Sequence, residues 1–334
     1  MNPVRAWRDG IRRVAGAPLI LVGVWLMTTL VSLPLTLAIR GEIANHLGAS
    51  LSAETAATGV NYEWMQEFAD QATGLGTTLK PTILGFGAVL DNLSAFIDNT
   101  ARPLIIVGAA SAYIVLWLFA AGGVIDRYAR DRATGAQGFF SASGVFFFRF
   151  LRLAIVMFAV YGLLFGYLHP WLFNREYPRL IREVNVERTA FLIRAGLYLV
   201  FGLVLAACNL VFDYAKVRAV VEDRRSALGA LVAAVRFIRR NLAAAVTVYL
   251  LNVALFALTL AAYAAVAPGA GGIGWTMWIG FAIGQLYILA RLSVKLIFWA
   301  SETALFQGRL AHAGYVAAAM PVWPDSPSAE AIHL

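Results

Sequence analysis

The residues from Ala17 to Ile39 read APLILVGVWLMTTLVSLPLTLAI and contain no charged side chain. A helix of these 23 residues is roughly 35 Å long, which is enough to cross the hydrocarbon core of a bilayer. The apolar part of a cleaved signal peptide is about 7–15 residues long, and no small-x-small cleavage site follows this segment. We therefore expect a retained first transmembrane helix.

The same pattern recurs along the chain. Five further apolar segments qualify as spans, at about residues 103–125, 153–172, 191–212, 242–267 and 274–297. Of the 334 residues, 60% are apolar and only 14% are charged, whereas a soluble domain carries about 25% charged residues. The sequence predicts an all-α polytopic membrane protein with six transmembrane helices in a single membrane domain, residues 1–334.

The placement of lysine and arginine predicts the orientation. If the N-terminus is cytoplasmic, 19 of the 27 basic residues fall on the inner side of the membrane and 8 on the outer side. This bias favours an inner N-terminus and an inner C-terminus. The pI near 9.8 has the same origin, so we expect anionic lipids as partners and no nucleic acid.

A repeat with a period of 87 residues relates the second and fourth spans. Val124-Ile-Asp126 ends the second span, and Val211-Phe-Asp213 ends the fourth. At the same offset, Arg149-Phe-Leu-Arg152 corresponds to Arg236-Phe-Ile-Arg239. A looser copy, Ile11-Arg-Arg13, precedes the first span and is similar to Ile238-Arg-Arg240.

This repeat predicts three hairpins, each entered through a short amphipathic helix that we call an elbow helix. The hairpins comprise residues 1–125, 126–212 and 213–334, the last with a C-terminal tail. An elbow in the inner interface places Phe148, Phe150 and Phe237 among acyl chains. The candidate headgroup contacts are Arg12, Arg13, Arg149, Arg152, Arg236, Arg239 and Arg240. Generic contact with the interface and binding of a specific anionic lipid or a protein partner are both open.

The external loop, residues 40–102, contains helical patterns. Asn61 is placed to cap a helix with Tyr62, Met65 and Phe68 on one face. A second amphipathic helix carries Ile83, Phe86, Leu90, Leu93 and Ile97. These helices cap the bundle or lie in the outer interface, and ligand sensing is the alternative. In the next outer loop, His169-Pro170 predicts a helix stop, and Arg179 and Glu183 predict an ion pair.

Charged residues near the inner ends of the spans predict an ion-pair cluster of Asp126, Asp213, Arg291 and Lys295. Each of these charges alone costs several kcal/mol in lipid, which pairing across the bundle offsets. The cluster either locks the helices together or gates a pathway or proton relay. Glu302 is interpreted as a solvated residue after the sixth span.

Three amides, Asn209, Asn252 and Gln285, lie within spans. Such amides usually form hydrogen bonds between helices, and a substrate path is the alternative. The only cysteine, Cys208, and the four scattered histidines do not predict a disulfide or a metal site. Walker A, G-x-S-x-G and H-E-x-x-H motifs are missing, so we expect neither a cofactor nor an enzyme.

Several segments carry a resemblance to a known group of proteins. Val211-Phe-Asp-Tyr-Ala-Lys216 and Val221-Glu-Asp-Arg-Arg-Ser-Ala227 resemble a segment of uncharacterised bacterial six-span inner-membrane proteins. Asp126-Arg-Tyr-Ala-Arg130, Gly138-Phe-Phe-Ser-Ala-Ser-Gly144 and Gly59-Val-Asn-Tyr-Glu-Trp64 are similar to other segments of them. The elbow-and-span layout more distantly resembles membrane domains associated with bacterial glycerophosphodiesterases. The resemblance implies a bacterial inner membrane and no assigned activity.

Two functions follow from these patterns. The first is a non-enzymatic, lipid-interacting scaffold or accessory component, which works with a protein partner or as a homo-oligomer. The alternative is a transporter or channel for a small or lipid-like substrate, because many transporters are built from repeats. A membrane-embedded enzyme would require convergent ionisable groups in one pocket.

Overall fold

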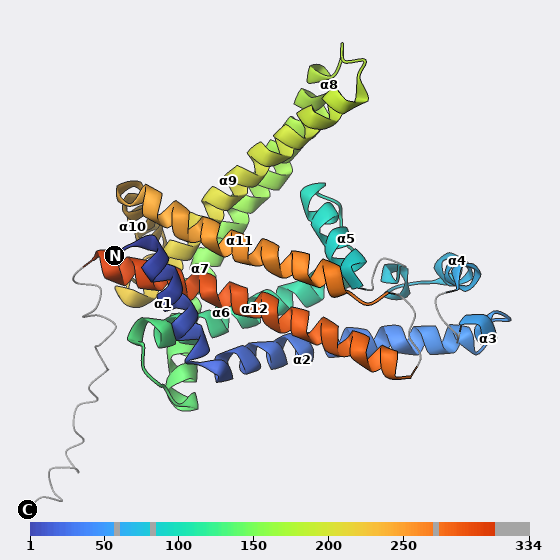
Figure 1. The fold of residues 1–334 in the computed structure, drawn as a ribbon, viewed down its shortest axis with the longest axis horizontal. Coiled ribbons are helices and arrows are strands. Elements are labelled where there is room, and N and C mark those ends of the chain that lie inside the picture. The colour runs from blue at the N-terminus through green and yellow to red at the C-terminus, as the bar shows by residue number, and fades with distance from the viewer. Residues whose placement is uncertain (57–60, 81–84, 270–273, 311–334) are drawn as a thin grey trace, which may run out of the picture.

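The computed structural model describes residues 1–56, 61–80, 85–269 and 274–310, and these residues form helices with no strand. The C-terminal tail and Ile83 lie outside the described residues. Figure 1 shows the arrangement. The helices are α1 (Pro3–Ala15), α2 (Pro18–Leu47), α3 (Ala53–Ala56), α4 (Tyr62–Gln71), η1 (Gly76–Thr78), α5 (Gly85–Ile97), α6 (Leu104–Arg130), α7 (Ala136–Leu163), η3 (Leu164–Leu168), η4 (Trp171–Glu176), α8 (Tyr177–Leu180), α9 (Glu187–Val221), α10 (Ala227–Arg240), α11 (Leu242–Val266) and α12 (Trp275–Arg309).

Six helical segments are long and apolar enough to cross a membrane, which confirms the all-α class and the six candidate spans. They are α2, α6, the continuous segment 136–180, α9, α11 and α12. Several extend beyond the predicted spans, because the basic and polar ends of the segments remain helical. The apolar windows of these helices are largely exposed in the isolated chain, as expected for surfaces that face lipid.

Helix α12 lies at the centre of the fold, where it packs against α1, α2, α6, α9 and α11. Its C-terminal half, from Leu292 to Phe306, is mostly buried. Helix α1 crosses it at Gly10, where an added Cβ would lie 2.6 Å from the backbone nitrogen of Ser301. A glycine at this crossing therefore allows the two backbones to approach closely.

The outer part of the α7–η3–η4–α8 segment and the adjoining part of α9 form an arm that leans away from the other spans, while α7 and α9 also pack against α6 (Figure 1). The predicted helix stop at His169-Pro170 is wrong, because the helix continues past Pro170 between two π-helical segments, η3 and η4. Such wider turns accommodate a residue that lacks the backbone N–H. The predicted partner of Arg179 is also wrong: its guanidinium binds Glu176 at 3.0 Å, one turn earlier.

Two of the three predicted elbows are separate helices. Helix α1 is separated from α2 at Gly16 and Ala17, and α10 is separated from α11 at Asn241. The second predicted elbow is not separate, since residues 136–163 form one helix. No glycine, proline or asparagine interrupts the sequence between Arg149 and Tyr161, so nothing local ends the helix there.

The described residues of the predicted external loop form α3, α4, η1 and α5, of which α4 and α5 contact the spans. Asn61 caps α4 as predicted, because its Oδ1 accepts a hydrogen bond from the Trp64 N–H at 2.9 Å. The buried face consists of Trp64 and Phe68, whereas Tyr62 is 70% exposed, so the predicted face is partly wrong. Trp64 donates from Nε1 to His46 at the end of α2, at 3.1 Å. The buried face of α4 is therefore the face whose side chains reach α2.

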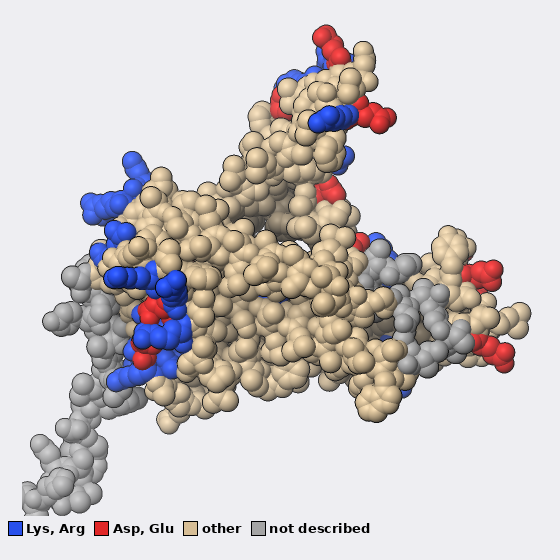
Figure 2. Space-filling model, viewed as in Figure 1, with Lys and Arg blue, Asp and Glu red and all other residues tan. Residues whose placement is uncertain are grey.

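Charged residues gather at the ends of the long axis. Figure 2 shows most visible lysine and arginine side chains at the end that carries α1 and α10. Acidic side chains appear at the opposite end of the body and at the tip of the arm. The apolar surface between these ends is the band expected to contact hydrocarbon.

Candidate functional site

Helix α10 has one face against the protein and one face outward. The inward face comprises Ala230, Ala233, Ala234, Phe237 and Ile238, all buried, and it packs mainly against α9. The outward face carries Leu228, Val232 and Val235, which are 65%, 60% and 40% exposed. Arg236, Arg239 and Arg240 are exposed near the end of the same helix. Apolar side chains beside exposed cations are typical of a helix in a membrane interface.

An arginine of α9 holds α10 in place. Arg218 Nη1 donates to the backbone oxygen of Ala233, while its Nε and Nη2 bind the Glu222 carboxylate at 3.0 and 2.6 Å. Arg224 also donates to Glu222. Burial by itself raises the pKa of Glu222, but the hydrogen bonds from the two arginines outweigh burial, so the pKa is lowered. Glu222 thus orients the guanidinium that fixes α10.

A hollow of about 540 Å³ opens on this helix. Arg224, Arg236 and Arg240 line it together with Leu228 and Val232. In the described part of the chain, no carboxylate lies within ion-pair distance of Arg236, Arg239 or Arg240. These guanidinium groups therefore remain available to an external anion such as a lipid phosphate.

The arginines of α1 that were also predicted to contact headgroups bind other groups of the protein instead. Arg13 binds Asp9, the backbone oxygen of Tyr128 and Gln307. Arg12 contacts Asp9 and Asp131 at 2.5 and 3.1 Å.

The two arginines predicted on α7 differ from each other. Arg149 pairs with Asp223, which precedes α10, so this guanidinium joins the second repeat unit to the third. Arg152 is exposed, and its Nε donates to the backbone oxygen of Phe148 on its own helix. Of the predicted contacts, those on α10 are therefore the most open to lipid.

The predicted insertion of Phe150 and Phe237 among acyl chains is wrong, because these rings are 1% and 3% exposed. Phe237 contacts Tyr214 and Phe306, and Phe150 stacks near Phe146. Both rings lie on the buried faces of their helices, α7 and α10. Phe148, at 67% exposed, is the one of the three that points outward.

The four charged residues predicted to form one cluster do not pair with one another. Asp126 pairs with Arg130 at 2.8 Å, and Asp213 pairs with Lys216 at 2.8 Å. Neither Arg291 nor Lys295 lies within ion-pair distance of a carboxylate in the described ranges. Both acids find a base on the following turn of their own helix, which satisfies them without a partner across the bundle.

Lys295 is nevertheless brought close to Asp213 by a pair of tryptophans. Its Nζ lies 3.5 Å from the centre of the Trp117 ring, a cation–π contact. Trp299, edge-on to Trp117, donates from Nε1 to Asp213 at 3.3 Å. Lys216 lies 5.5 Å from the Trp299 ring centre. Aromatic faces thus hold both lysines beside one aspartate.

The three side-chain amides within the spans form hydrogen bonds within a helix or between helices. Asn209 donates to Asp213 at 3.0 Å, and Asn252 donates to Ser301 of α12 at 2.9 Å. Gln285 accepts a hydrogen bond from Trp25 of α2 at 2.9 Å. Two of these bonds join separate spans, as side-chain amides in membranes commonly do.

Glu302 was not recognised as a buried residue from the sequence. Instead of lying in solvent after the last span, it is 0% exposed within α12, and neither carboxylate oxygen has a hydrogen-bond partner in the described residues. The expectation was wrong because α12 remains helical to Arg309 and is covered by α1. The apolar run Ala304-Leu-Phe306 after Glu302 was the available signal.

No group of three or more histidine, cysteine, aspartate or glutamate side chains suited to a metal occurs in the part of the chain that the structure describes. No family model, no curated protein and no solved structure matches this chain. The resemblance to uncharacterised bacterial membrane proteins therefore stays a prediction.

Proposed function

We propose that this chain is a multi-pass, non-enzymatic membrane component that binds anionic lipid through its elbow helices, foremost α10. The observation that carries the proposal is the set of exposed guanidinium groups of Arg236, Arg239 and Arg240, which form no ion pair with the described residues and lie beside exposed leucine and valine side chains. Each basic residue near an anionic surface contributes about 1 kcal/mol of attraction. Such a helix would anchor a scaffold or accessory protein to one leaflet.

We further propose that the six spans form three hairpins with both termini in the cytoplasm of a bacterium, in its inner membrane. The basic end of the molecule supports this orientation, because positive residues favour the cytoplasmic side (Figure 2). A protein partner or a second copy of the chain would complete the assembly.

The test is enrichment of anionic lipid around the purified protein. Wild-type protein is reconstituted in bilayers of phosphatidylglycerol and phosphatidylcholine, extracted with its surrounding lipid by a polymer, and the lipid is quantified by mass spectrometry. We expect phosphatidylglycerol to be enriched over the bulk membrane, and the enrichment to fall in a triple variant with Arg236→Gln, Arg239→Gln and Arg240→Gln.

The matched control removes the same charge from the arm, where Arg175, Arg182 and Arg188 are exposed. Glutamine at these three positions should leave the enrichment unchanged. Equal enrichment in wild type and the α10 variant would overturn the proposal.

A transporter is the second candidate, and the buried Glu302 favours it. Unpaired ionisable groups in membrane spans commonly mark ion or substrate pathways. A water-soluble carbodiimide should modify Glu302 only if an aqueous path reaches it. Modification found by peptide mass spectrometry would favour transport, and its absence, with reaction at exposed Glu63 as the positive control, would favour a dry structural core.

A further inference from the structure

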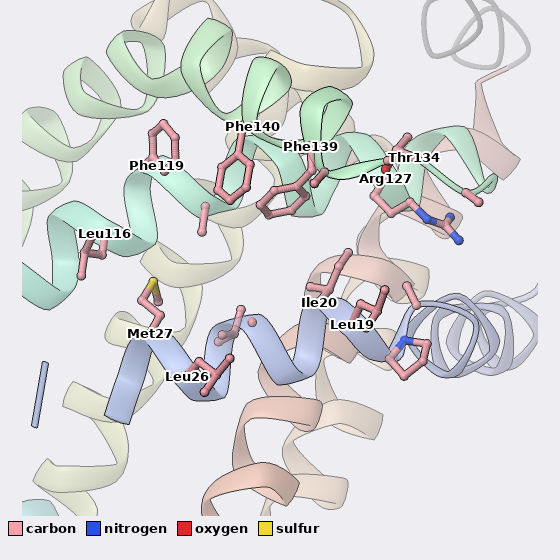
Figure 3. Close-up of a pocket in the computed structure, with 18 of the residues that line it drawn as sticks. Leu19, Ile20, Leu26, Met27, Leu116, Phe119, Arg127, Thr134, Phe139 and Phe140 are labelled. Carbon is pink, nitrogen blue, oxygen red and sulfur yellow. The ribbon is translucent and has the colours of Figure 1, made fainter. Parts of the chain in front are cut away.

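An apolar groove of about 670 Å³ runs between α2 and the facing parts of α6 and α7. In Figure 3, Leu19, Ile20, Leu26 and Met27 of α2 lie across the groove from side chains of α6 and α7. The facing side chains are Leu116, Phe119, Phe139 and Phe140. Several of them are open to the surroundings, with Leu26 48% and Phe140 58% exposed. The groove is therefore a lipid-accessible surface rather than a filled interior.

The groove has the length of one bilayer leaflet. Along α2 its lining extends from Gly16 to Leu30, which corresponds to about 21 Å of helix. Half of a bilayer, with its headgroup region included, is about 20–22 Å thick. An acyl chain lying along α2 would therefore fit with its carboxyl-ester end near Gly16 and its methyl end near Leu30.

Two helix N-termini converge at the Gly16 end. The lining includes Ala17 and Pro18, where α2 begins, and Gly135 and Ala136, where α7 begins. Neither N-cap makes a side-chain hydrogen bond, and neither first turn contains an acidic residue. Each N-terminus thus presents the positive end of a long helix to the same place, which favours an anion.

A guanidinium with a free hydrogen-bond donor lies at this end as well. Arg127 appears beside Thr134 at one end of the groove in Figure 3. Its Nη2 donates to the backbone oxygen of Gly16 at 3.3 Å, whereas its Nη1 is buried and has no partner in the described residues. A buried donor without an acceptor is costly. Arg127 as a whole is only partly buried, so a rotation of its side chain would bring this donor to a phosphate oxygen in the groove.

We infer that this groove is a discrete binding site for one anionic glycerophospholipid. Its phosphate lies between Arg127 and the N-termini of α2 and α7, and one acyl chain follows α2 between the aromatic rings of α6 and α7. The site lies apart from the arginines of α10 and binds a single lipid molecule, whereas α10 contacts many. This inference rests on the proposed function only because it requires the protein to lie in a membrane that contains anionic lipid.

Native mass spectrometry of the full chain in detergent tests the site. Wild-type protein is given phosphatidylglycerol or diacylglycerol, which has the same chains but no phosphate. We expect one phosphatidylglycerol retained per chain and little diacylglycerol. In Arg127→Gln, retention of phosphatidylglycerol should fall about tenfold, as for one charge-assisted hydrogen bond. Equal retention of the two lipids by wild type would overturn the inference.

A second pair of variants tests the apolar part of the groove. Gly23 lines the groove, and an added Cβ there would meet nothing within 4 Å. In Gly23→Phe the ring should fill the groove and displace the lipid. Gly108 of α6 is equally open but lies outside the lining, so Gly108→Phe should retain it. Retention in Gly23→Phe equal to that in Gly108→Phe would contradict the site.

Photo-crosslinking provides a readout that does not depend on a variant. A phosphatidylglycerol with a diazirine in one acyl chain, reconstituted with wild-type protein, should label peptides from the groove lining, residues 16–30, 116–127 and 133–140. Labelling spread evenly over all spans would indicate annular lipid only. The α10 triple variant should keep this label even if it loses its general enrichment in anionic lipid, so the two proposals can fail separately.

Discussion

Asp213 shows how one residue organises the buried polar core. Its side chain, 6% exposed, accepts hydrogen bonds from Asn209, Lys216 and Trp299. These donors come from its own helix and from α12, so the carboxylate joins two spans. Because the site excludes water, the loss of this charge leaves lysine uncompensated among apolar side chains.

We expect Asp213→Asn to lower the free energy of unfolding by about 3 kcal/mol, the usual cost of breaking a buried ion pair. Thermal unfolding in detergent measures the change. Glu176→Gln removes the acid of the more exposed pair with Arg179 and should cost less than about 1 kcal/mol. Adding Lys216→Met to Asp213→Asn should restore part of the loss, and no restoration would argue against the pair as the cause.

Glu222 makes the stability depend on pH at the α9–α10 junction. Its pKa is lowered in the fold from an ordinary value of 4.5, despite burial, because Arg218 and Arg224 bind the ionised form. The stabilisation is therefore complete above about pH 4.5 and is lost as the pH falls through the lowered pKa. Wild type should lose more thermal stability than Glu222→Gln between pH 5 and pH 3.

The control for this titration is Glu63→Gln, since Glu63 is exposed on α4. Its pH profile should follow that of wild type. A Glu222→Gln profile parallel to wild type over the whole range would show that the carboxylate adds nothing to the junction.

At the scale of elements, small residues set how closely the helices approach. An added Cβ on Gly123 of α6 would lie 2.6 Å from Ser143 Oγ and 2.7 Å from the Phe139 backbone oxygen of α7. The 87-residue offset pairs Ser143 with Ala230, which is also buried at a helix contact. The two copies of the repeat therefore use different small residues at their helix contacts. The α6–α7 contact has Gly123 on α6, and the α9–α10 contact has Ala230 on α10.

We expect Gly123→Ala to destabilise the protein, because the added Cβ would overlap a backbone atom of α7 and force the two helices apart. Gly108→Ala on the same helix should be neutral or stabilising by about 0.5–1 kcal/mol, since its surroundings are open and alanine favours helix. Thermal unfolding of the two variants provides the comparison. Similar effects of both substitutions would contradict the close α6–α7 contact.

Elements also differ in how far the sequence predicts them. The helices α1, α4 and α10 were predicted from basic patterns and from the Asn61 cap. The repeat of residues 149 and 236 predicted a separate helix correctly at Arg236 but not at Arg149. The continuous helix through Pro170 was not predicted, because its π-helical segments depend on packing against α5 and α9. The His169 ring, held at 2.8 Å from the Ile97 carbonyl, is part of that packing.

At the scale of the whole molecule, the charge distribution predicts the orientation in the membrane. A variant without the native cysteine, Cys208→Ser, serves as the background for single cysteines in a bacterial host. Asp70→Cys, on the loop that we propose to be external, should react in intact cells with a membrane-impermeant maleimide. Arg132→Cys, on the exposed α6–α7 connection at the basic end, should react only after the cells are opened. The reverse pattern would overturn the proposed orientation.

The sequence by itself determined the helical class and the six candidate spans, because hydropathy and length are local properties of each segment. It also located the basic segments of α1 and α10 and the arginines that α10 exposes. Only the tertiary structure decided that Glu302 is buried, that Lys216 rather than Arg291 partners Asp213, and that Arg127 ends an apolar groove. In a membrane the lipid is as apolar as the protein interior, so the pattern of hydrophobic residues does not reveal which face of a span turns inward. That choice is made by close packing and by the partners available to each polar group.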